Sequence, residues 1–270
     1  MAEIKEWGRT KVSGQPQVAE KQIVIRQCRT VEEFQACVAL QKEVWRYSDA
    51  DVIPVRLFVV ASKIGGQIIG SFDGDVLVGF VLSIPGSRQG HSYLHSQMLA
   101  VRESYRNLGL GRRMKLAQRE EALERGFKLM EWTFDPLEIK NAFLNIEKLG
   151  TIARRYSVNQ YGSSSSPLQG GLPTDRLVAE WWLSSDGVNN LLQNGIKRPI
   201  KVEETVSVPA QIYAWKASEA KRSQALNIQQ ANREQFLHAF SRGLAVLRYE
   251  RDMQGNGIFL LGKPEEAFSF

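Results

Sequence analysis

The sequence predicts an α/β protein with mixed strand pairing. Strand-like and helical segments alternate along the first two thirds of the chain. The pair Asp73-Gly74 lies between two apolar runs and signals a hairpin, which requires at least one antiparallel pair. A glycine-containing turn at residues 105–115 then connects a strand to a helix. Together these observations indicate an α/β plan.

The elements before this turn follow from local signals. Residues 23–28 read as a strand. A helix follows, because Thr30 and Glu33 make a capping box and Phe34, Cys37 and Val38 belong to an apolar helical stripe. We predict a helix over residues 54–63, the hairpin over 66–86 and a third strand over 92–101.

The turn is followed by further alternating elements. A helix over residues 110–125 ends at Gly126, and a strand over 128–136 ends at a proline. A helix closes at Gly150, a strand spans 152–158, a Ser/Gly/Pro loop spans 162–173, and another strand spans 176–185. Beyond residue 185 the pattern predicts a polar helix near 218–241 and strands near 243–252 and 257–263.

These elements give three expected parts. Residues 1–21 form a flexible tail, residues 22–185 form the main domain, and residues 186–270 form a C-terminal α/β extension. The extension carries no motif, and three roles for it stay open. It completes the sheet, covers the cleft as a second half-domain, or makes a dimer contact, so a homodimer is among the expected states.

Composition narrows the classes of function. The chain has 270 residues, 43% of them hydrophobic, and a formal net charge of +6. Because basic and acidic residues are interleaved, the charge does not favour a nucleic-acid binder. Two cysteines give no disulfide framework, and no apolar run is long enough to span a membrane. We expect a cytoplasmic protein without a metal, a nucleic-acid partner or a membrane partner.

The stretch YRNLGLGRRMK at residues 105–115 combines two glycines with four basic residues. A strand, a glycine loop and a helix start form a ready anion site, because the first helical amides lack internal acceptors. Gly109 and Gly111 let phosphates approach the backbone, and Arg106 and Arg112 add charge-assisted bonds. The alternative is a bare glycine turn with solvated charge.

The spacing of the stretch matches neither the P-loop nor the dinucleotide fingerprint. It matches R-x-x-G-x-G at residues 106–111, preceded by Leu99, Ala100 and Val101. This resembles motif A of the GNAT acyltransferases, and NIEKLG at 145–150 resembles the end of that family's motif B helix. The resemblance covers residues 23–162 and implies a mixed, mostly antiparallel sheet flanked by helices.

The resemblance also implies an acyl-coenzyme A as co-substrate. Its pyrophosphate would lie on the loop, its pantetheine would pair with the strand ending at Val101, and the strand ending at Phe134 would splay from it. The implied coenzyme-binding residues are Leu99, Ala100, Val101, Arg106, Asn107, Leu108, Gly109, Leu110, Gly111, Arg112, Phe134 and Asn141.

Acyl transfer to an amine needs a proton acceptor, because a lysine-like ammonium has a pKa of about 10.4. In the strand YLHSQMLAV, strict alternation places His95 and Gln97 on one face with Leu99 and Val101. By resemblance to arylalkylamine N-acetyltransferases, His95 is the base, and Gln97 stands where that family has a second histidine. A structural histidine bonded to a neighbouring carbonyl is the equal alternative.

The general acid is less defined. The family's usual tyrosine falls at Ile146, which cannot donate a proton. Tyr156 and Tyr161 are weaker candidates for protonating the thiolate, with water as the other source. Both tyrosines are more often packing residues.

Gln97 and three further residues are candidates for the acceptor site. Asp175 and Arg176 follow the serine loop and suit a zwitterionic or carboxylate-bearing substrate, although a capped loop with a surface salt bridge is the alternative. Trp45 follows the first helix, where the family often forms a substrate rim.

We therefore expect an N-acyltransferase that moves an acetyl or succinyl group from coenzyme A to a small-molecule amine, with amino acids among the acceptors. The alternative is a coenzyme-binding regulatory module without catalysis.

Overall fold

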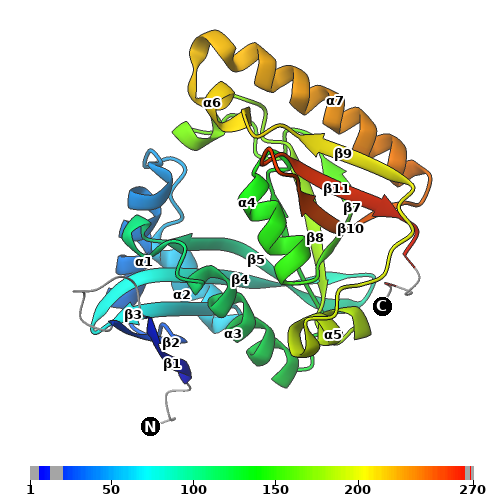
Figure 1. Ribbon diagram of the computed structural model, residues 1–270. Helices are drawn as coiled ribbons and strands as arrows, with labels where there is room; N and C mark the ends of the chain where they lie inside the picture. Colours follow the sequence, from blue (N-terminus) through cyan, green and yellow to red (C-terminus); the bar gives the residue numbers. More distant parts are fainter. Residues whose placement is uncertain (1–5, 13–20, 265–267, 269–270) are drawn as a thin grey trace. The chain divides into compact units, whose positions relative to one another are not determined.

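The computed structural model describes residues 6–12, 21–264 and 268. Two compact units, Met1–Phe127 and Lys128–Phe270, divide the chain (Figure 1). Both units combine helices with an antiparallel sheet, which confirms the predicted α/β class. The predicted boundary after residue 185 falls inside the second unit.

The first unit holds five strands in the order β1-β2-β3-β4-β5, and each neighbouring pair is antiparallel. Its elements are β1 (Glu6–Val12), β2 (Lys21–Gln27), α1 (Val31–Trp45), α2 (Val55–Lys63), β3 (Gln67–Asp73), β4 (Val76–Arg88), β5 (His91–Val101), η1 (Glu103–Tyr105) and α3 (Leu110–Glu124). Strand β1 lies in the segment expected to be a tail, and residues 1–5 and 13–20 lie outside the described part.

Local signals start α1 and turn the hairpin. Thr30 Oγ1 accepts from Glu33 N, and the Glu33 carboxylate accepts from Thr30 N, so both bonds of the predicted capping box form. Between β3 and β4, Asp73 pairs with Val76, which leaves Gly74 and Asp75 as the turn. Gly74 takes a positive φ of 59°, which explains the glycine there.

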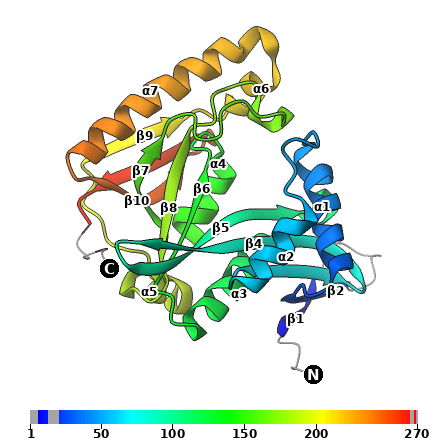
Figure 2. The same ribbon diagram turned by 180° about the vertical axis from the view of Figure 1, so that it is seen from behind.

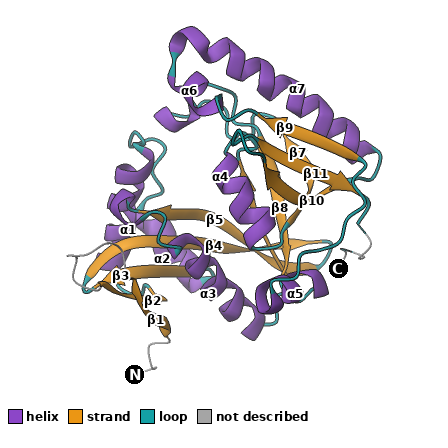
Figure 3. Cartoon of the chain, viewed as in Figure 1, coloured by secondary structure: helices purple, strands orange, loops and turns teal. Residues whose placement is uncertain are grey.

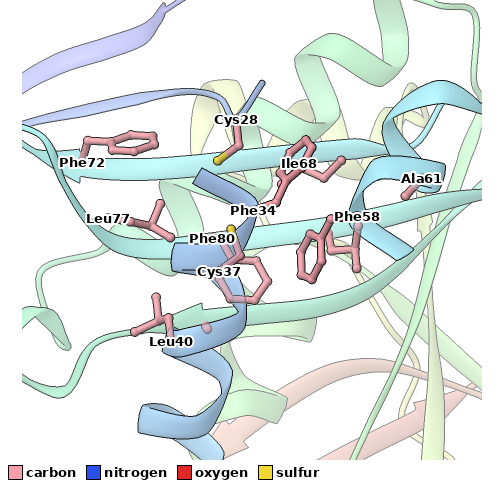
Figure 4. Packing of buried hydrophobic residues seen from close by; sticks show 12 residues of the cluster. Cys28, Phe34, Cys37, Leu40, Phe58, Ala61, Ile68, Phe72, Leu77 and Phe80 are labelled. Atoms are coloured by element: carbon pink, nitrogen blue, oxygen red, sulfur yellow. The ribbon is translucent and has the colours of Figure 1, made fainter. Parts of the chain in front are cut away.

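Helices cover both faces of this sheet. Figure 2 shows α1 and α2 in front of β3 and β4, and their apolar residues form one core cluster with that face. Within it, the rings of Phe34 and Phe58 lie 6.1 Å apart and those of Phe58 and Phe80 lie 5.8 Å apart (Figure 4). On the other face, Met114 and Ala117 of α3 pack against the sheet.

The second unit holds six strands in the order β6-β8-β7-β10-β11-β9 (Figure 3). The described pairings within it are antiparallel. Its elements are β6 (Leu129–Phe134), α4 (Ile139–Ala142), η2 (Phe143–Lys148), β7 (Ile152–Ser157), η3 (Pro167–Gln169), β8 (Arg176–Trp182), α5 (Asp186–Asn194), β9 (Glu204–Val208), α6 (Ile212–Ala217), η4 (Glu219–Lys221), α7 (Arg222–Ser241), β10 (Ala245–Arg251) and β11 (Gly257–Gly262).

The C-terminal strands complete this sheet. Strand β10 pairs with β7 through Val246 and Ala153, and β11 lies between β10 and β9. Helix α7 packs along β7 and β9. Of the three roles left open for residues 186–270, the structure shows the first one.

The predicted helix ending at Gly150 changes its winding partway. It begins as α4 and continues as the π-helix η2, in which Leu149 N donates to Leu144 O. Gly150 follows with φ of 76°, as expected for a residue that ends a helix. Within the described residues, no helix is both long and apolar enough to cross a membrane.

Candidate functional site

The loop before α3 contains two residues in left-handed conformations. Asn107 and Gly109 both take left-handed conformations, with φ of 64° and 72°. Gly109 caps α3 without a side-chain hydrogen bond, and the first turn carries no acidic residue. Because the first helical N–H groups have no acceptor inside a helix, this end of α3 suits an anion.

Apolar side chains anchor this loop. Leu110 is 1% exposed, and with Leu108 it packs against Ile23, Val78 and Tyr105. These two leucines contribute packing, so the loop offers a ligand its backbone at these positions.

The nearby arginines differ in what they contact. Arg106 is exposed, and its Nε donates to Val101 O at 3.2 Å, which ties the loop to the end of β5. Arg102 pairs with Glu43 at 3.1 Å. Arg113 is half-buried and donates to Ile23 O at 3.4 Å, and burial lowers its pKa. Arg106 is therefore better placed than Arg102 or Arg113 to contact a ligand. The half-buried Arg112 is the second candidate.

A β-bulge interrupts β5 at Gln97. Ser96 pairs with Ser83 and Met98 pairs with Leu82, so Gln97 is the extra residue. The bulge shifts the alternation of side chains by one position. After it, Leu99 and Val101 pack toward α3, whereas Met98 and Ala100 pack toward α1 and α2.

This shift corrects one sequence prediction. His95 pairs with Ile84, whose side chain packs with the α1 and α2 cluster. His95 therefore lies on the α1 and α2 face, and the prediction that it shares a face with Leu99 and Val101 is wrong. Strict alternation fails because the bulge adds a residue that no local pattern marks. His95 is half-buried, and Gln97 at the bulge is exposed.

A buried polar group lies on the opposite side of the same segment. Lys115 of α3 is 3% exposed, and its Nζ donates to Ser96 Oγ at 2.8 Å and Gln118 Oε1 at 3.1 Å. Burial lowers the pKa of Lys115 well below its ordinary value. The sequence analysis missed this residue. Its position between Met114 and Ala117 in the apolar stripe of the helix was the available signal.

Trp45 ends α1 beside a second aromatic residue. Its ring stacks on Tyr47 with centroids 5.6 Å apart, and Arg46 between them takes a left-handed φ of 54°. Trp45 is half-buried against the core of the unit, which leaves part of the ring accessible.

The remaining coenzyme candidates belong to the second unit. Phe134 at the end of β6 is 2% exposed, so its side chain serves the core. Asn141 in α4 is exposed, and its Oδ1 accepts from Asn145 Nδ2 at 3.3 Å. Ile146 is 2% exposed and packed. The predicted splay of the two strands ending at Val101 and Phe134 stays a prediction.

Asp175 is the centre of a buried network. Its side chain is fully buried and accepts from Tyr156 Oη at 2.7 Å, Asn159 N at 2.9 Å and Arg233 Nε at 2.8 Å. Burial and the bond to this carboxylate raise the pKa of Tyr156. These contacts hold the end of β7 and the start of β8 against α7, which is a structural role.

Tyr161 has a different environment from Tyr156. It is 49% exposed, and its hydroxyl lies 2.9 Å from Thr133 Oγ1 on β6. The guanidinium of Arg176 lies 5.5 Å from the centre of its ring, and Arg176 Nη2 also donates to Gln169 at 3.3 Å. Of the two tyrosines predicted as weak acid candidates, Tyr161 is the more exposed residue.

In the part of the chain that the structure describes, no three His, Cys, Asp or Glu side chains gather in a group that could hold a metal ion.

Comparisons with solved structures give likenesses in fold. The ribosomal-protein-S18-alanine N-acetyltransferase from Escherichia coli is 16% identical with a TM-score of 0.48, covering 62% of this chain and 98% of that one. A GNAT-family acetyltransferase from Streptococcus pneumoniae is 17% identical with a TM-score of 0.48, covering 59% and 98%. The comparison with curated proteins gives no match.

The sequence also matches a family model. Residues 32–145 match the family described as Acetyltransferase (GNAT) family. The matched span contains helix α1 from its second residue, the bulged strand β5, the α3 loop and most of the helix that continues into η2. Residues 32–145 therefore resemble an acetyltransferase domain of the GNAT family.

Proposed function

We propose that the protein is a cytoplasmic N-acyltransferase that uses acetyl-coenzyme A or another acyl-coenzyme A, with succinyl as the second donor to test. The observation that carries this proposal is the start of α3, where left-handed Asn107 and Gly109 precede an uncapped helix inside the family match. Backbone amides and Arg106 would bind the pyrophosphate of the donor there.

The acceptor is a small-molecule amine, and amino acids are the first acceptors to test. Its nitrogen forms the new C–N bond at the thioester carbonyl carbon, and the C–S bond breaks. The ammonium form must first lose a proton, and the leaving thiolate must gain one. We propose that His95 accepts this proton. We propose that Gln97, at the bulge, contacts the amine substrate.

Tyr161 is the proposed source of the proton for the thiolate. The exposure of Tyr161 supports it over Tyr156, whose hydroxyl already donates to Asp175. The ring of Trp45 and the guanidinium of Arg176 are proposed contacts for the acceptor. Asp175 acts in this proposal only through the loop that it holds.

Binding and transfer are tested in two steps. Calorimetric titration with acetyl-, succinyl- and free coenzyme A measures donor binding, and thiol release over an amine panel then measures transfer. Arg106→Gln should weaken coenzyme binding about tenfold, since it removes a charge-assisted contact. Arg102→Gln is the matched control, because Arg102 already pairs with Glu43. Failure of every coenzyme A species to bind would contradict the proposal.

A coenzyme-binding module without catalysis is the second candidate. The buried Ile146 in place of the family's tyrosine favours it. Tight coenzyme binding without thiol release for any amine would support this second candidate.

A further inference from the structure

A cavity in the second unit is lined by residues that the proposed reaction does not use. It has a volume of about 500 Å³ and lies among α5, residues 196–203, β10 and Lys263 after β11. Figure 1 shows the connection that runs from α5 to β9. Small-molecule sites in proteins occupy roughly 300–1,000 Å³. The cavity is therefore large enough for a metabolite.

Cations dominate the charge of the lining. Among the lining residues that the structure describes, Lys197, Arg198, Lys201 and Lys263 are basic and Glu203 is acidic. Glu203 itself lies 4.0 Å from Arg242 Nη2. The field inside the cavity is therefore positive.

One of these cations, Lys197, pairs with a buried carboxylate, that of Glu147. Lys197 Nζ lies 2.8 Å from Glu147 Oε2, and Glu147 Oε1 accepts from Arg248 Nε at 2.7 Å and Tyr249 N at 2.8 Å. Burial opposes ionisation of Glu147, but these contacts outweigh it and lower its pKa. The Glu147 charge is thus neutralised within the protein, and Arg198, Lys201 and Lys263 keep the lining positive.

Backbone contacts fix the wall that carries these cations. Glu203 N donates to Leu261 O at 2.8 Å, and Arg248 Nη1 donates to Arg198 O at 3.2 Å. At Gly187 in the first turn of α5, an added Cβ would lie 2.6 Å from Arg198 Nη2. The guanidinium therefore packs directly on the α5 backbone, and the glycine makes room for it. A wall fixed in this way forms the cavity before a ligand arrives.

Apolar residues complete the lining. Ile196, Pro199, Ile200 and Leu247 contribute carbon surface, and Asn190 adds an amide. Phosphate or sulfate alone would leave this surface unused. A carbon frame that carries several anionic groups would use both the cations and the apolar wall.

We propose that this cavity binds a small organic anion with two or more carboxylate or phosphate groups, at a site separate from the residues proposed for acyl transfer. None of its lining residues belongs to the predicted coenzyme, base or acceptor set. The proposal holds whether or not the protein transfers acyl groups.

Titration of the full chain with citrate and with fructose 1,6-bisphosphate tests the proposal. Calorimetry at low ionic strength measures the affinity, and the citrate and bisphosphate arms distinguish carboxylate from phosphate recognition. The variants described next distinguish binding in this cavity from binding at the α3 loop. At least one probe should bind, and its affinity should fall as salt is added.

Variants locate the site. Lys201→Gln combined with Lys263→Gln should weaken binding at least about fivefold, since two charge contacts are lost. Lys128→Gln combined with Lys221→Gln is the matched control, because these lysines are also exposed, belong to the second unit and lie outside the lining. The control should stay within about twofold of the parent protein.

All four lysines are exposed, so neither double variant should change the fold, and circular dichroism checks this. The proposal is overturned if neither probe binds, or if the two double variants lose affinity equally. It is also overturned if the variant at Lys201 and Lys263 binds as the parent protein does.

Discussion

Lys216 Nζ lies 2.9 Å from Asp135 Oδ2, although 81 residues separate them and both side chains are buried. The same amine lies 2.7 Å from Glu138 Oε1. Burial opposes the charge on Lys216, but the two carboxylates outweigh it and raise its pKa. A buried cation thus connects α6 to the turn between β6 and α4.

Replacing this lysine should destabilise the second unit strongly. Lys216→Met would leave Asp135 buried without its cation, and breaking such a pair costs about 3–5 kcal/mol. Urea unfolding followed by circular dichroism measures the change. Lys221→Met, at an exposed lysine of the same region, should change the unfolding free energy by less than about 1 kcal/mol. Equal stability of the two variants would show that the pair contributes little.

Gly109→Ala should impair coenzyme binding through the backbone. Gly109 has φ of 72°, and an added Cβ would meet no atom within 4 Å, so the cost is conformational. A left-handed alanine costs roughly 1–2 kcal/mol, and relief of that strain would turn the first α3 amides away. We expect about five- to thirtyfold weaker coenzyme A binding by calorimetry, since about 1.4 kcal/mol is a factor of ten.

Gly74→Ala is the matched control for this change. Gly74 also has a positive φ, 59°, and open space around it, but it lies in the hairpin turn. Both variants should lose similar stability, while only Gly109→Ala loses coenzyme affinity. If Gly74→Ala lost as much coenzyme affinity as Gly109→Ala, the α3 loop would have no special part in binding the coenzyme.

His95→Ala tests the proposed base. Loss of a general base costs about 10²- to 10⁴-fold in rate. The residual rate should rise with pH up to the pKa of the acceptor amine, because the unprotonated amine no longer needs a base. His91→Ala, at the exposed start of the same strand, should leave the rate unchanged. An unaltered rate in His95→Ala would make His95 a structural residue.

Lys115 should make stability depend on pH. Burial lowers its pKa in the folded protein, so the unfolded chain binds more protons between this lowered pKa and the ordinary value of about 10.5. Stability should therefore increase as pH rises toward that ordinary value, and decrease as pH falls through the window. Where the unfolded chain binds one full proton more than the folded protein, each pH unit changes the free energy of unfolding by about 1.4 kcal/mol.

Lys115→Met removes this contribution. Urea unfolding of both proteins between about pH 7 and about pH 10 should show the parent protein gaining stability relative to the variant as pH rises. If the unfolding free energies of the two proteins changed with pH in parallel, Lys115 would keep its ammonium form in the folded protein.

Local signals account for what the sequence predicted. The capping box at Thr30 and Glu33, the hairpin at Gly74 and the helix start at Gly109 each depend on a few neighbouring residues, and the structure contains all three. Turn and cap preferences act over such short spans, so they are readable from sequence.

Features that depend on distant residues were not readable. The bulge at Gln97 exists only through the register of β5 on β4, and it moved His95 to the other face. The network around Asp175 needs Arg233, 58 residues away. Elements α5, β9 and α6 have weak local patterns and form against the sheet of the second unit. Tertiary packing overrides local preference in such segments.

Strand order in the second unit also imposes an order of events during synthesis. Strand β9 (Glu204–Val208) pairs with β11 (Gly257–Gly262), which is made about fifty residues later and inserts between β9 and β10. A growing chain that has just produced β9 therefore carries an open strand edge until β11 follows. Unpaired edges of this kind promote association between chains, so a chain halted within β10 should be more prone to aggregate than one extended past Gly262.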